Sequence, residues 1–222
     1  MKSKEVTIFG ATGLIGNFIL KNLINDNDYH KINLVTRRPF SYSHKKVIIH
    51  LIDFTDIESL SKTIKNSQVV FASIGTTQSK VNGDNKAYRK IDFDIIYNIA
   101  NTCKKNKVKN FSFVSTAGAN IDSNNFYLNL KGEIEKSVSN LNLLSTSVFR
   151  PSLLLGKRKE IRYGEKIAQL IMPLISFLMP SIYKPINASL VAKSMINISK
   201  KILISMKIEL FSYHIIVCKK SI

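Results

Sequence analysis

The stretch Val6-Thr7-Ile8-Phe9-Gly10-Ala11-Thr12-Gly13-Leu14-Ile15-Gly16 decides the fold of this 222-residue chain. An apolar run of strand length is followed at once by three glycines, and a helical pattern starts directly after them. Such a turn lets the backbone approach a pyrophosphate, and the helix N-terminus offers free N–H donors. The order therefore predicts a site for a phosphate-bearing cofactor, formed by Gly10, Thr12, Gly13, Leu14, Ile15 and Gly16. A tight turn without a ligand is the alternative, and the absence of a closing Gly-Lys-Ser/Thr excludes a P-loop.

Runs of strand length alternate with helical patterns beyond this stretch. Strands are predicted near residues 5–9, 31–36, 47–52, 69–74, 109–115 and 144–150, and helices near 14–25, 56–65, 87–106 and 124–140. The strands are continuous apolar runs, which is typical of parallel sheets covered by helices on both faces. The alternation predicts an α/β fold, a Rossmann-type doubly wound parallel sheet.

The regular alternation of strand and helix patterns ends after Pro151. Residues 160–204 have a helical pattern interrupted by prolines, and residues 207–217 have a β-rich pattern. Because 45% of the chain is hydrophobic, it can bury a full core, and its length favours one domain over 1–222. We expect a cofactor-binding core in about 1–155 and a small C-terminal segment, about 156–222, whose helices and last strand cover the substrate.

The longest apolar stretch, residues 167–183, is interrupted by a glutamine, a serine and two prolines. It is too short and too broken for a membrane span. We interpret it as a buried or partner-facing helix pair, which leaves homo-oligomerisation open.

Charge raises the question of a polyanionic partner. The 33 Lys and Arg side chains against 15 Asp and Glu give a formal net charge of +18. Such an excess of positive charge is typical of proteins that bind a nucleic acid or an anionic membrane surface. The excess is spread over both halves of the chain, however, and most of it is Lys, whereas Arg reads bases and forks onto phosphates. We expect no nucleic-acid partner.

The cellular location is predicted from the cysteines and the N-terminus. Cys103 and Cys218 cannot form a multi-bridge framework, and neither has a partner at metal-ligand spacing. The N-terminal residues lead directly into the first strand pattern, without a signal-peptide pattern. We therefore expect a cytoplasmic protein, and we predict no metal site.

Two arginines follow the second predicted strand. In dinucleotide-binding folds an acidic residue about 20 positions after the glycines holds the ribose hydroxyl of NAD, whereas an Arg there accommodates the 2′-phosphate of NADP. Arg37 and Arg38 occupy this place, and no carboxylate does. They favour NADP(H) as the cofactor. Two solvated arginines at a strand end are the alternative.

Further strand ends point to the same crevice. Asp53, after the third predicted strand, lies where the adenine edge is usually held, and Gly75, Thr76 and Thr77 follow the fourth strand, where the cofactor backbone would pass. Each signal alone is weak.

A tyrosine and a lysine four residues apart form the candidate catalytic group. Tyr127 and Lys131 lie on one face of a predicted helix, and Ser115 ends the preceding strand. A phenol titrates near pH ~10, so a tyrosine that exchanges protons at neutral pH needs a nearby cation. The serine would hydrogen-bond a substrate carbonyl oxygen. A second match, Tyr42 and Lys46, has no chemical context, and we treat it as chance.

These residues together resemble the short-chain dehydrogenase/reductase superfamily in its extended and atypical branch, and more closely the HIV Tat-interacting-protein-like oxidoreductases and their bacterial relatives. The similarity spans residues 5–200. The segments that carry it are Thr36-Arg37-Arg38-Pro39, Ser73-Ile74-Gly75-Thr76-Thr77, Tyr88-Arg89-Lys90-Ile91-Asp92-Phe93-Asp94, Ser115-Thr116-Ala117-Gly118-Ala119-Asn120, Phe126-Tyr127-Leu128-Asn129-Leu130-Lys131-Gly132-Glu133-Ile134-Glu135, Phe149-Arg150-Pro151-Ser152-Leu153-Leu154-Leu155-Gly156 and Arg158-Lys159-Glu160-Ile161-Arg162-Tyr163-Gly164-Glu165.

The resemblance implies an NADP(H)-binding Rossmann domain with Ser115, Tyr127 and Lys131 in the catalytic positions. It also implies that Ser73, Lys131, Arg150 and Pro151 belong to the cofactor site. Thr116 stands where relatives often have a second serine, so either hydroxyl of the pair could face the substrate.

Two functions remain open at this point. We expect an NADP(H)-dependent oxidoreductase that acts on a small carbonyl or alcohol. The alternative is a regulatory protein that binds NADP(H) as a signal and acts through protein contacts, because fold membership does not fix chemistry.

Overall fold

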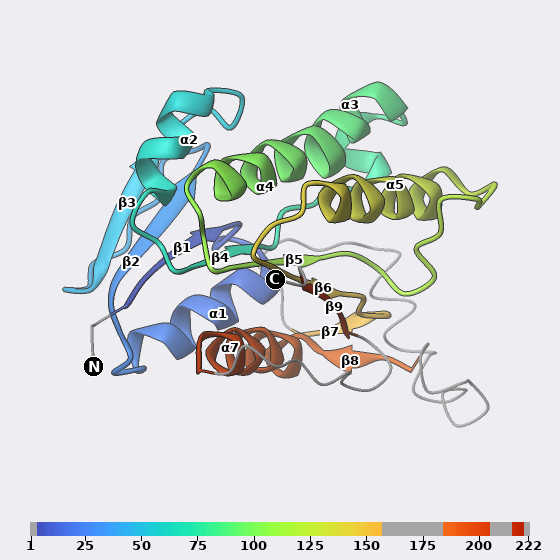
Figure 1. Ribbon diagram of the computed structural model, residues 1–222. Helices are drawn as coiled ribbons and strands as arrows, with labels where there is room; N and C mark the ends of the chain where they lie inside the picture. Colours follow the sequence, from blue (N-terminus) through green and yellow to red (C-terminus); the bar gives the residue numbers. More distant parts are fainter. Residues whose placement is uncertain (1–3, 157–183, 205–214, 220–222) are drawn as a thin grey trace.

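The computed structural model describes residues 4–156, 184–204 and 215–219. In this part of the chain a seven-stranded sheet lies between two layers of helices (Figure 1). Its strands are β1 (Lys4–Phe9), β2 (Tyr29–Thr36), β3 (Val47–Leu51), β4 (Val69–Ala72), β5 (Asn110–Val114), β6 (Ser145–Phe149) and β9 (Ile215–Lys219).

The strand order across the sheet is β3-β2-β1-β4-β5-β6-β9. Strands β1 to β6 are parallel, and β9 runs antiparallel to β6. The order 3-2-1-4-5-6 is that of the dinucleotide-binding doubly wound fold. The predicted Rossmann-type fold is therefore confirmed.

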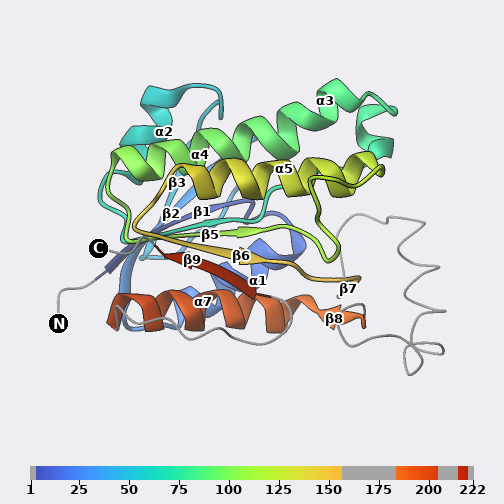
Figure 2. The same ribbon diagram turned by 45° about the vertical axis from the view of Figure 1, so that its right-hand side comes forward.

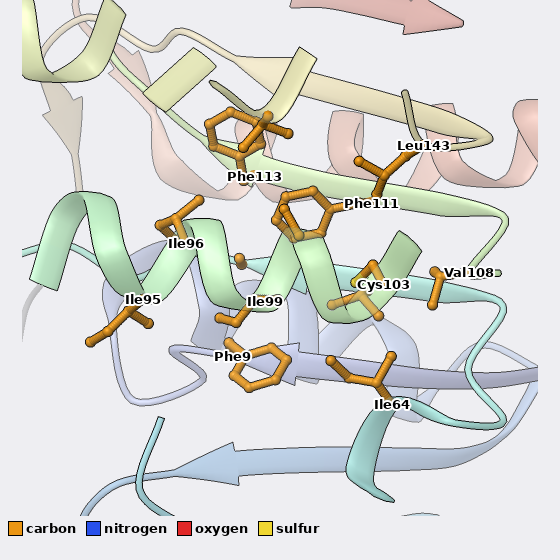
Figure 3. Packing of buried hydrophobic residues seen from close by; sticks show 14 of the residues in the cluster. Phe9, Ile64, Ile95, Ile96, Ile99, Cys103, Val108, Phe111, Phe113 and Leu143 are labelled. Carbon is orange, nitrogen blue, oxygen red and sulfur yellow. The ribbon is translucent and has the colours of Figure 1, made fainter. Parts of the chain in front are cut away.

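Helices cover both faces of the sheet, as Figures 1 and 2 show from two directions. The helices α2 (Ile57–Ile64), α4 (Ile95–Lys105) and α5 (Phe126–Asn140) lie on one face, and α1 (Leu14–Ile24) and α7 (Ala188–Ile204) lie on the other. On the α4 face, Ile95, Ile96, Ile99 and Cys103 pack against Phe9, Phe111 and Phe113 of the strands (Figure 3). Because helices cover both faces, every residue of β4 and β6 is buried.

The helix predicted over 87–106 is more complex than the pattern suggests. It starts earlier, with α3 (Asn85–Arg89), and Asp84 caps it by accepting hydrogen bonds from Lys86 N and Ala87 N. A π-helical turn, η2 (Lys90–Asp94), joins α3 to α4. A short 3₁₀ turn, η1 (Gln78–Val81), precedes α3.

Helix α7 is the helix of the C-terminal part that the structure describes. Helix α7 lies in the segment expected to cover the substrate, yet it packs in the layer of α1, where Val191, Ala192 and Met195 join the same apolar cluster as Ile19 and Leu23. Helix α7 therefore helps to bury this face of the sheet, and the substrate-covering role of the C-terminal segment stays a prediction. The prediction over 167–183 lies outside the described residues.

Two further elements complete the described part. Strands β7 (Leu154–Leu155) and β8 (Ile186–Asn187) form a small parallel pair next to the main sheet. The β-rich pattern predicted over 207–217 overlaps β9, which ends at Lys219, and its residues 207–214 lie outside the described part. No described helix is both long and apolar enough to cross a membrane.

Candidate functional site

Predicted site residues outside α5 (Phe126–Asn140) follow the carboxyl ends of parallel strands. The glycines come after β1, Arg37 after β2, Asp53 after β3, Gly75 after β4 and Ser115 after β5. Because these strands are parallel, their ends meet at one edge of the sheet, where open α/β sheets bind ligands.

The glycine turn is shaped so that side chains are excluded at two positions. Gly10 has φ +83°, and a Cβ there would lie 2.6 Å from the carbonyl oxygen of Ser73. A Cβ on Gly16 would lie 2.1 Å from the carbonyl oxygen of Gly10. The turn itself closes through a hydrogen bond from Gly13 N to Gly10 O of 2.9 Å. The sequence thus brings α1 into close contact with the end of β1 and β4.

The N-terminus of α1 offers its backbone to a ligand. Thr12 and Gly13 are exposed, and no side chain caps the helix. Ile15 is buried in the core, so it can contribute only its backbone, and Leu14 is half-buried. Uncapped N–H groups and the positive end of the helix dipole fit a phosphate group.

The end of β2 carries a second polar group without a partner. The hydroxyl of Thr36 is buried and makes no hydrogen bond within the described part of the chain. Arg37 and Arg38, which follow it, are exposed, and the Arg37 guanidinium lies 5.5 Å from the centre of the Phe54 ring. An unsatisfied hydroxyl beside two cationic groups fits the ribose and phosphate of a dinucleotide.

Asp53 is exposed beyond β3. Its carboxylate accepts a hydrogen bond from Thr55 N at 2.9 Å. Hydrogen bonds from Thr55 lower the pKa of Asp53 most, and the charge of Arg37 lowers it further. Asp53 therefore stays ionised beside the arginine that the sequence assigns to the cofactor phosphate.

The loop after β4 is fixed by contacts of its own. The Ser73 hydroxyl donates to Phe9 O at 3.3 Å and to Gly10 O at 3.4 Å, so this side chain braces the glycine turn. Thr76 N donates to a carboxylate oxygen of Asp92 at 2.7 Å, and Thr76 O accepts from the Tyr88 hydroxyl at 3.2 Å. Thr77 leads into η1.

The helix α5 brings Tyr127 and Lys131 together. It begins after Asn125, whose side chain accepts a hydrogen bond from Leu128 N at 3.1 Å. Lys131 Nζ lies 5.9 Å from the centre of the Tyr127 ring, and the ring of Tyr88 meets that of Tyr127 edge to face. Tyr127 is half-buried, whereas the side chain of Lys131 is 5% exposed.

Lys131 is buried as one half of an ion pair. Its Nζ lies 2.7 Å from a carboxylate oxygen of Asp92, which is itself buried. Burial alone would lower the pKa of Lys131, but the carboxylate of Asp92, with smaller contributions from Tyr127 and Glu135, raises it above the usual value. Lys131 is therefore a cation at neutral pH.

Ser115 and Arg150 are both bound to Glu135. The buried hydroxyl of Ser115 donates to the Glu135 carboxylate. The Arg150 guanidinium makes a forked contact with the same carboxylate, with Nε at 3.0 and 3.1 Å from its two oxygens. Pro151 is buried, and its carbonyl accepts from Ala117 N at 2.9 Å. The neighbouring Thr116 is half-exposed.

Asp92 and Glu135 lie in segments that carry the family resemblance, but the sequence analysis gave neither a role in the site. Asp92 stands between apolar residues in a helical pattern, and Glu135 follows Lys131 by four residues. An acidic residue at an apolar position of a helix is the signal that could have found the first, and i,i+4 spacing the second.

The second Tyr-x-x-x-Lys match has a structural role. Lys46 Nζ donates to Ile24 O and Asp26 O, both at 2.9 Å. It therefore binds the carbonyls at the C-terminus of α1, which lies at the opposite edge of the sheet from the glycine turn.

Metal ligands do not gather in the described residues. No group of three or more His, Cys, Asp and Glu side chains in this part of the chain could hold an ion.

Comparison with known families identifies the chain. A family described as NAD(P)H-binding matches residues 10–161. The chain belongs to this NAD(P)H-binding family. It is also 33% identical over 172 residues to protein HTATIP2 of Rattus norvegicus, a match that covers 76% of this chain and 70% of that protein. The resemblance to Tat-interacting-protein-like members of the atypical short-chain dehydrogenase/reductases is thereby confirmed.

Another relative overturns the predicted location. The chain is 34% identical over 200 residues to protein FMP52 of Candida albicans, which is named a mitochondrial protein, and the match covers 87% of both chains. The FMP52 proteins of Candida glabrata and Saccharomyces cerevisiae are also named mitochondrial. The prediction of a cytoplasmic protein is wrong, because a count of two cysteines excludes only a multi-bridge disulfide framework and does not distinguish reducing compartments.

Solved structures share the NAD(P)H-binding fold. A UDP-N-acetylglucosamine 4-epimerase from Methanobrevibacter ruminantium superposes with a TM-score of 0.71 at 21% identity, covering 90% of this chain and 74% of the other. A wide-type short-chain dehydrogenase/reductase from Veillonella parvula in complex with NADP gives 0.60 at 18% identity, with coverages of 88% and 86%. At these identities the likeness shows the fold alone.

Proposed function

We propose that this protein is an NADP(H)-dependent oxidoreductase that acts on a small carbonyl or alcohol. The observation that carries the proposal is the pair formed by Tyr127 and Lys131 at the ligand-binding edge of the sheet, with Lys131 charged and 5.9 Å from the Tyr127 ring. A fixed cation beside a phenol favours the phenolate, which is what a tyrosine acid or base needs.

The roles of the residues follow from their placement. When bound, the cofactor supplies or accepts the hydride. The Tyr127 phenol gives its proton to the substrate oxygen in reduction and takes it back in oxidation, and Lys131 stabilises the phenolate left behind. Because the Ser115 hydroxyl donates to Glu135, we propose that the half-exposed Thr116 supplies the hydroxyl that orients the substrate oxygen.

We assign the cofactor to the edge between the glycine turn and Arg37. The supporting features are the uncapped α1 N-terminus, the unsatisfied hydroxyl of Thr36 and the exposed Arg37 and Arg38. The absence of a carboxylate directly after β2 favours NADP(H) over NAD(H), because a carboxylate there would repel the 2′-phosphate.

The experiment is a turnover assay with NADPH over a panel of small aldehydes and ketones. We expect consumption of NADPH with at least one of them, and a loss of about 100-fold or more in kcat for Tyr127→Phe. Thr116→Val should lower kcat more than Ser115→Ala if Thr116 faces the substrate. Equal turnover by wild type and Tyr127→Phe would reject the role of Tyr127.

Binding of NADPH without turnover across the panel would favour the regulatory alternative. A pulldown repeated with and without NADPH, using the full chain as bait, would then show whether a partner depends on the nucleotide.

From the names of the FMP52 relatives we propose a mitochondrial location. Co-localisation of the tagged full chain with a mitochondrial marker tests it, and a diffuse cytosolic signal would contradict it.

A further inference from the structure

A buried carboxylate lies beside the proposed catalytic pair of Tyr127 and Lys131. Asp92 is 2% exposed and contacts Lys131, which the proposed function uses, and Thr76, which the sequence assigns to the cofactor site. One oxygen lies 2.7 Å from Lys131 Nζ, and the other accepts from Thr76 N at 2.7 Å. It thereby joins α5 to the loop after β4.

The backbone around Asp92 is unusual. Asp92 lies in the π-helical turn η2, where the regular i→i−4 ladder between α3 and α4 is interrupted. Such turns occur often at functional sites, because the extra residue changes the direction of side chains without ending the helix. Asp92 is buried in this turn and contacts Lys131 of α5.

The other charged groups near Lys131 already have partners. Glu133 binds Arg89 at 2.5 Å, and Glu135 binds Arg150. Asp92 is thus the carboxylate that contacts Lys131 directly among the described residues, with Tyr127 and Glu135 as the further groups whose charges reach it. Burying two charges is costly, so this pair needs a reason beyond stability.

We propose that Asp92 is the positioning residue of this site, which keeps Lys131 charged while buried and fixes it relative to the loop after β4. The inference rests on the proposed roles of Tyr127 and Lys131. Without the carboxylate, Lys131 would be a buried ammonium whose burial favours the neutral amine.

Asp92→Asn tests the charge alone. Asparagine keeps an oxygen that can accept from Thr76 N, but it no longer compensates Lys131. In this variant burial lowers the pKa of Lys131, so the folded protein releases a proton that the unfolded chain, with a lysine pKa near 10.5, still binds. The free energy of unfolding of the variant then rises with pH between the lowered pKa of Lys131 in the folded variant and the pKa of lysine in the unfolded chain.

The stability readout is the difference in urea midpoint between wild type and Asp92→Asn, measured from pH 7 to pH 10. We expect the difference to narrow as the pH rises. The matched control is Asp92→Asn/Lys131→Met, in which no buried amine remains and the difference from wild type should not narrow in this way. A deficit of Asp92→Asn that is equal at every pH would show a merely structural contact and overturn the proposal.

The activity readout is the alkaline limb of kcat/KM. For Asp92→Asn it should move to lower pH by about one unit or more, because Lys131 loses its charge earlier. An unchanged limb would also overturn the proposal, whereas wild type without any turnover would reject the proposed function and leave the stability test valid.

A second variant serves if Asp92→Asn does not fold. Lys131→Met leaves the carboxylate buried without its cation, so its stability deficit should narrow as the pH falls from 7 toward 5. A deficit of Lys131→Met that does not depend on pH in that interval would overturn the pairing.

Discussion

The two halves of the ligand-binding edge treat their polar groups in opposite ways. Around β1 and β2, the α1 N-terminus is uncapped and the Thr36 hydroxyl has no partner among the described residues. Around β5 and β6, polar side chains are bound to one another, with Lys131 on Asp92 and Arg150 on Glu135. A buried polar group without a partner in the protein leaves a hydrogen bond open for a ligand, whereas a paired group is held in place by the protein itself.

The largest effect on stability is expected at Glu135, whose carboxylate binds two side chains. Glu135→Ala leaves Arg150 and the Ser115 hydroxyl without their acceptor, and we expect a loss of about 3 kcal/mol in the free energy of unfolding in the absence of cofactor. Glu133→Ala, two residues away on α5, removes a more exposed pair and should cost about 0.2–1 kcal/mol. Urea denaturation measures both. Equal losses would erase the distinction between the halves.

The next effect concerns the cofactor half. Arg37→Met should weaken NADPH binding by about 10–100-fold and leave NADH binding nearly unchanged, because charge-assisted hydrogen bonds are worth about 1.5–3 kcal/mol. Arg38→Met is the matched variant, since Arg38 lacks the contact with the Phe54 ring that Arg37 makes. Fluorescence titration with both nucleotides gives the ratio. Parallel losses for NADH and NADPH would show that Arg37 does not read the 2′-phosphate.

A smaller effect has the opposite sign for stability and binding. Thr36→Val removes a buried hydroxyl without a partner, so it should raise the free energy of unfolding by about 1 kcal/mol while weakening NADPH binding. Thr7→Val is the control on the neighbouring strand β1. The Thr7 hydroxyl lies 2.6 Å from the Ser67 hydroxyl and donates to Thr63 O at 3.1 Å, so its loss should destabilise. The same sign for both variants would refute the interpretation of Thr36.

The smallest expected effect on stability concerns an ion pair outside both halves of the ligand-binding edge, and it serves as a reference for the others. A hydrogen bond from Lys200, assisted by its charge, lowers the pKa of Asp28 below its usual value of 3.8. A lowered folded-state pKa gives stability that is present above about pH 4 and is lost as the pH falls below it. Lys200→Met should therefore lose less stability than wild type between pH 5 and pH 3. The shift in melting temperature measures it, and parallel curves would contradict it.

Local patterns made the fold predictable. The run from Val6 to Gly16 contains the strand, the turn and the helix start within a few residues, so neighbouring side chains alone specify them. The predicted strands accordingly agree with β1 to β6 to within a few residues at each end.

Pairings across the fold were not predictable. Asp92 and Lys131 meet only because the π-helical turn η2 packs against α5. The sequence around either residue gives no sign of the other. The layer of α7 was missed for a similar reason, since its apolar face gives no sign of which face of the sheet it covers. Ser115 was predicted from its position after β5, but its bond to Glu135 depends on α5.

The π-helical turn η2 has a consequence for how such a chain tolerates insertions and deletions. Each residue of an α-helix advances the side-chain direction by about 100°. Removing one residue within η2 would restore a regular helix and keep the apolar face of α4 on the sheet, while the segment before it, including α3, would rotate. The number of residues between α3 and α4 therefore sets which residue faces α5. A single-residue deletion in η2 would change the contacts of Lys131 while the core packing of α4 stays the same.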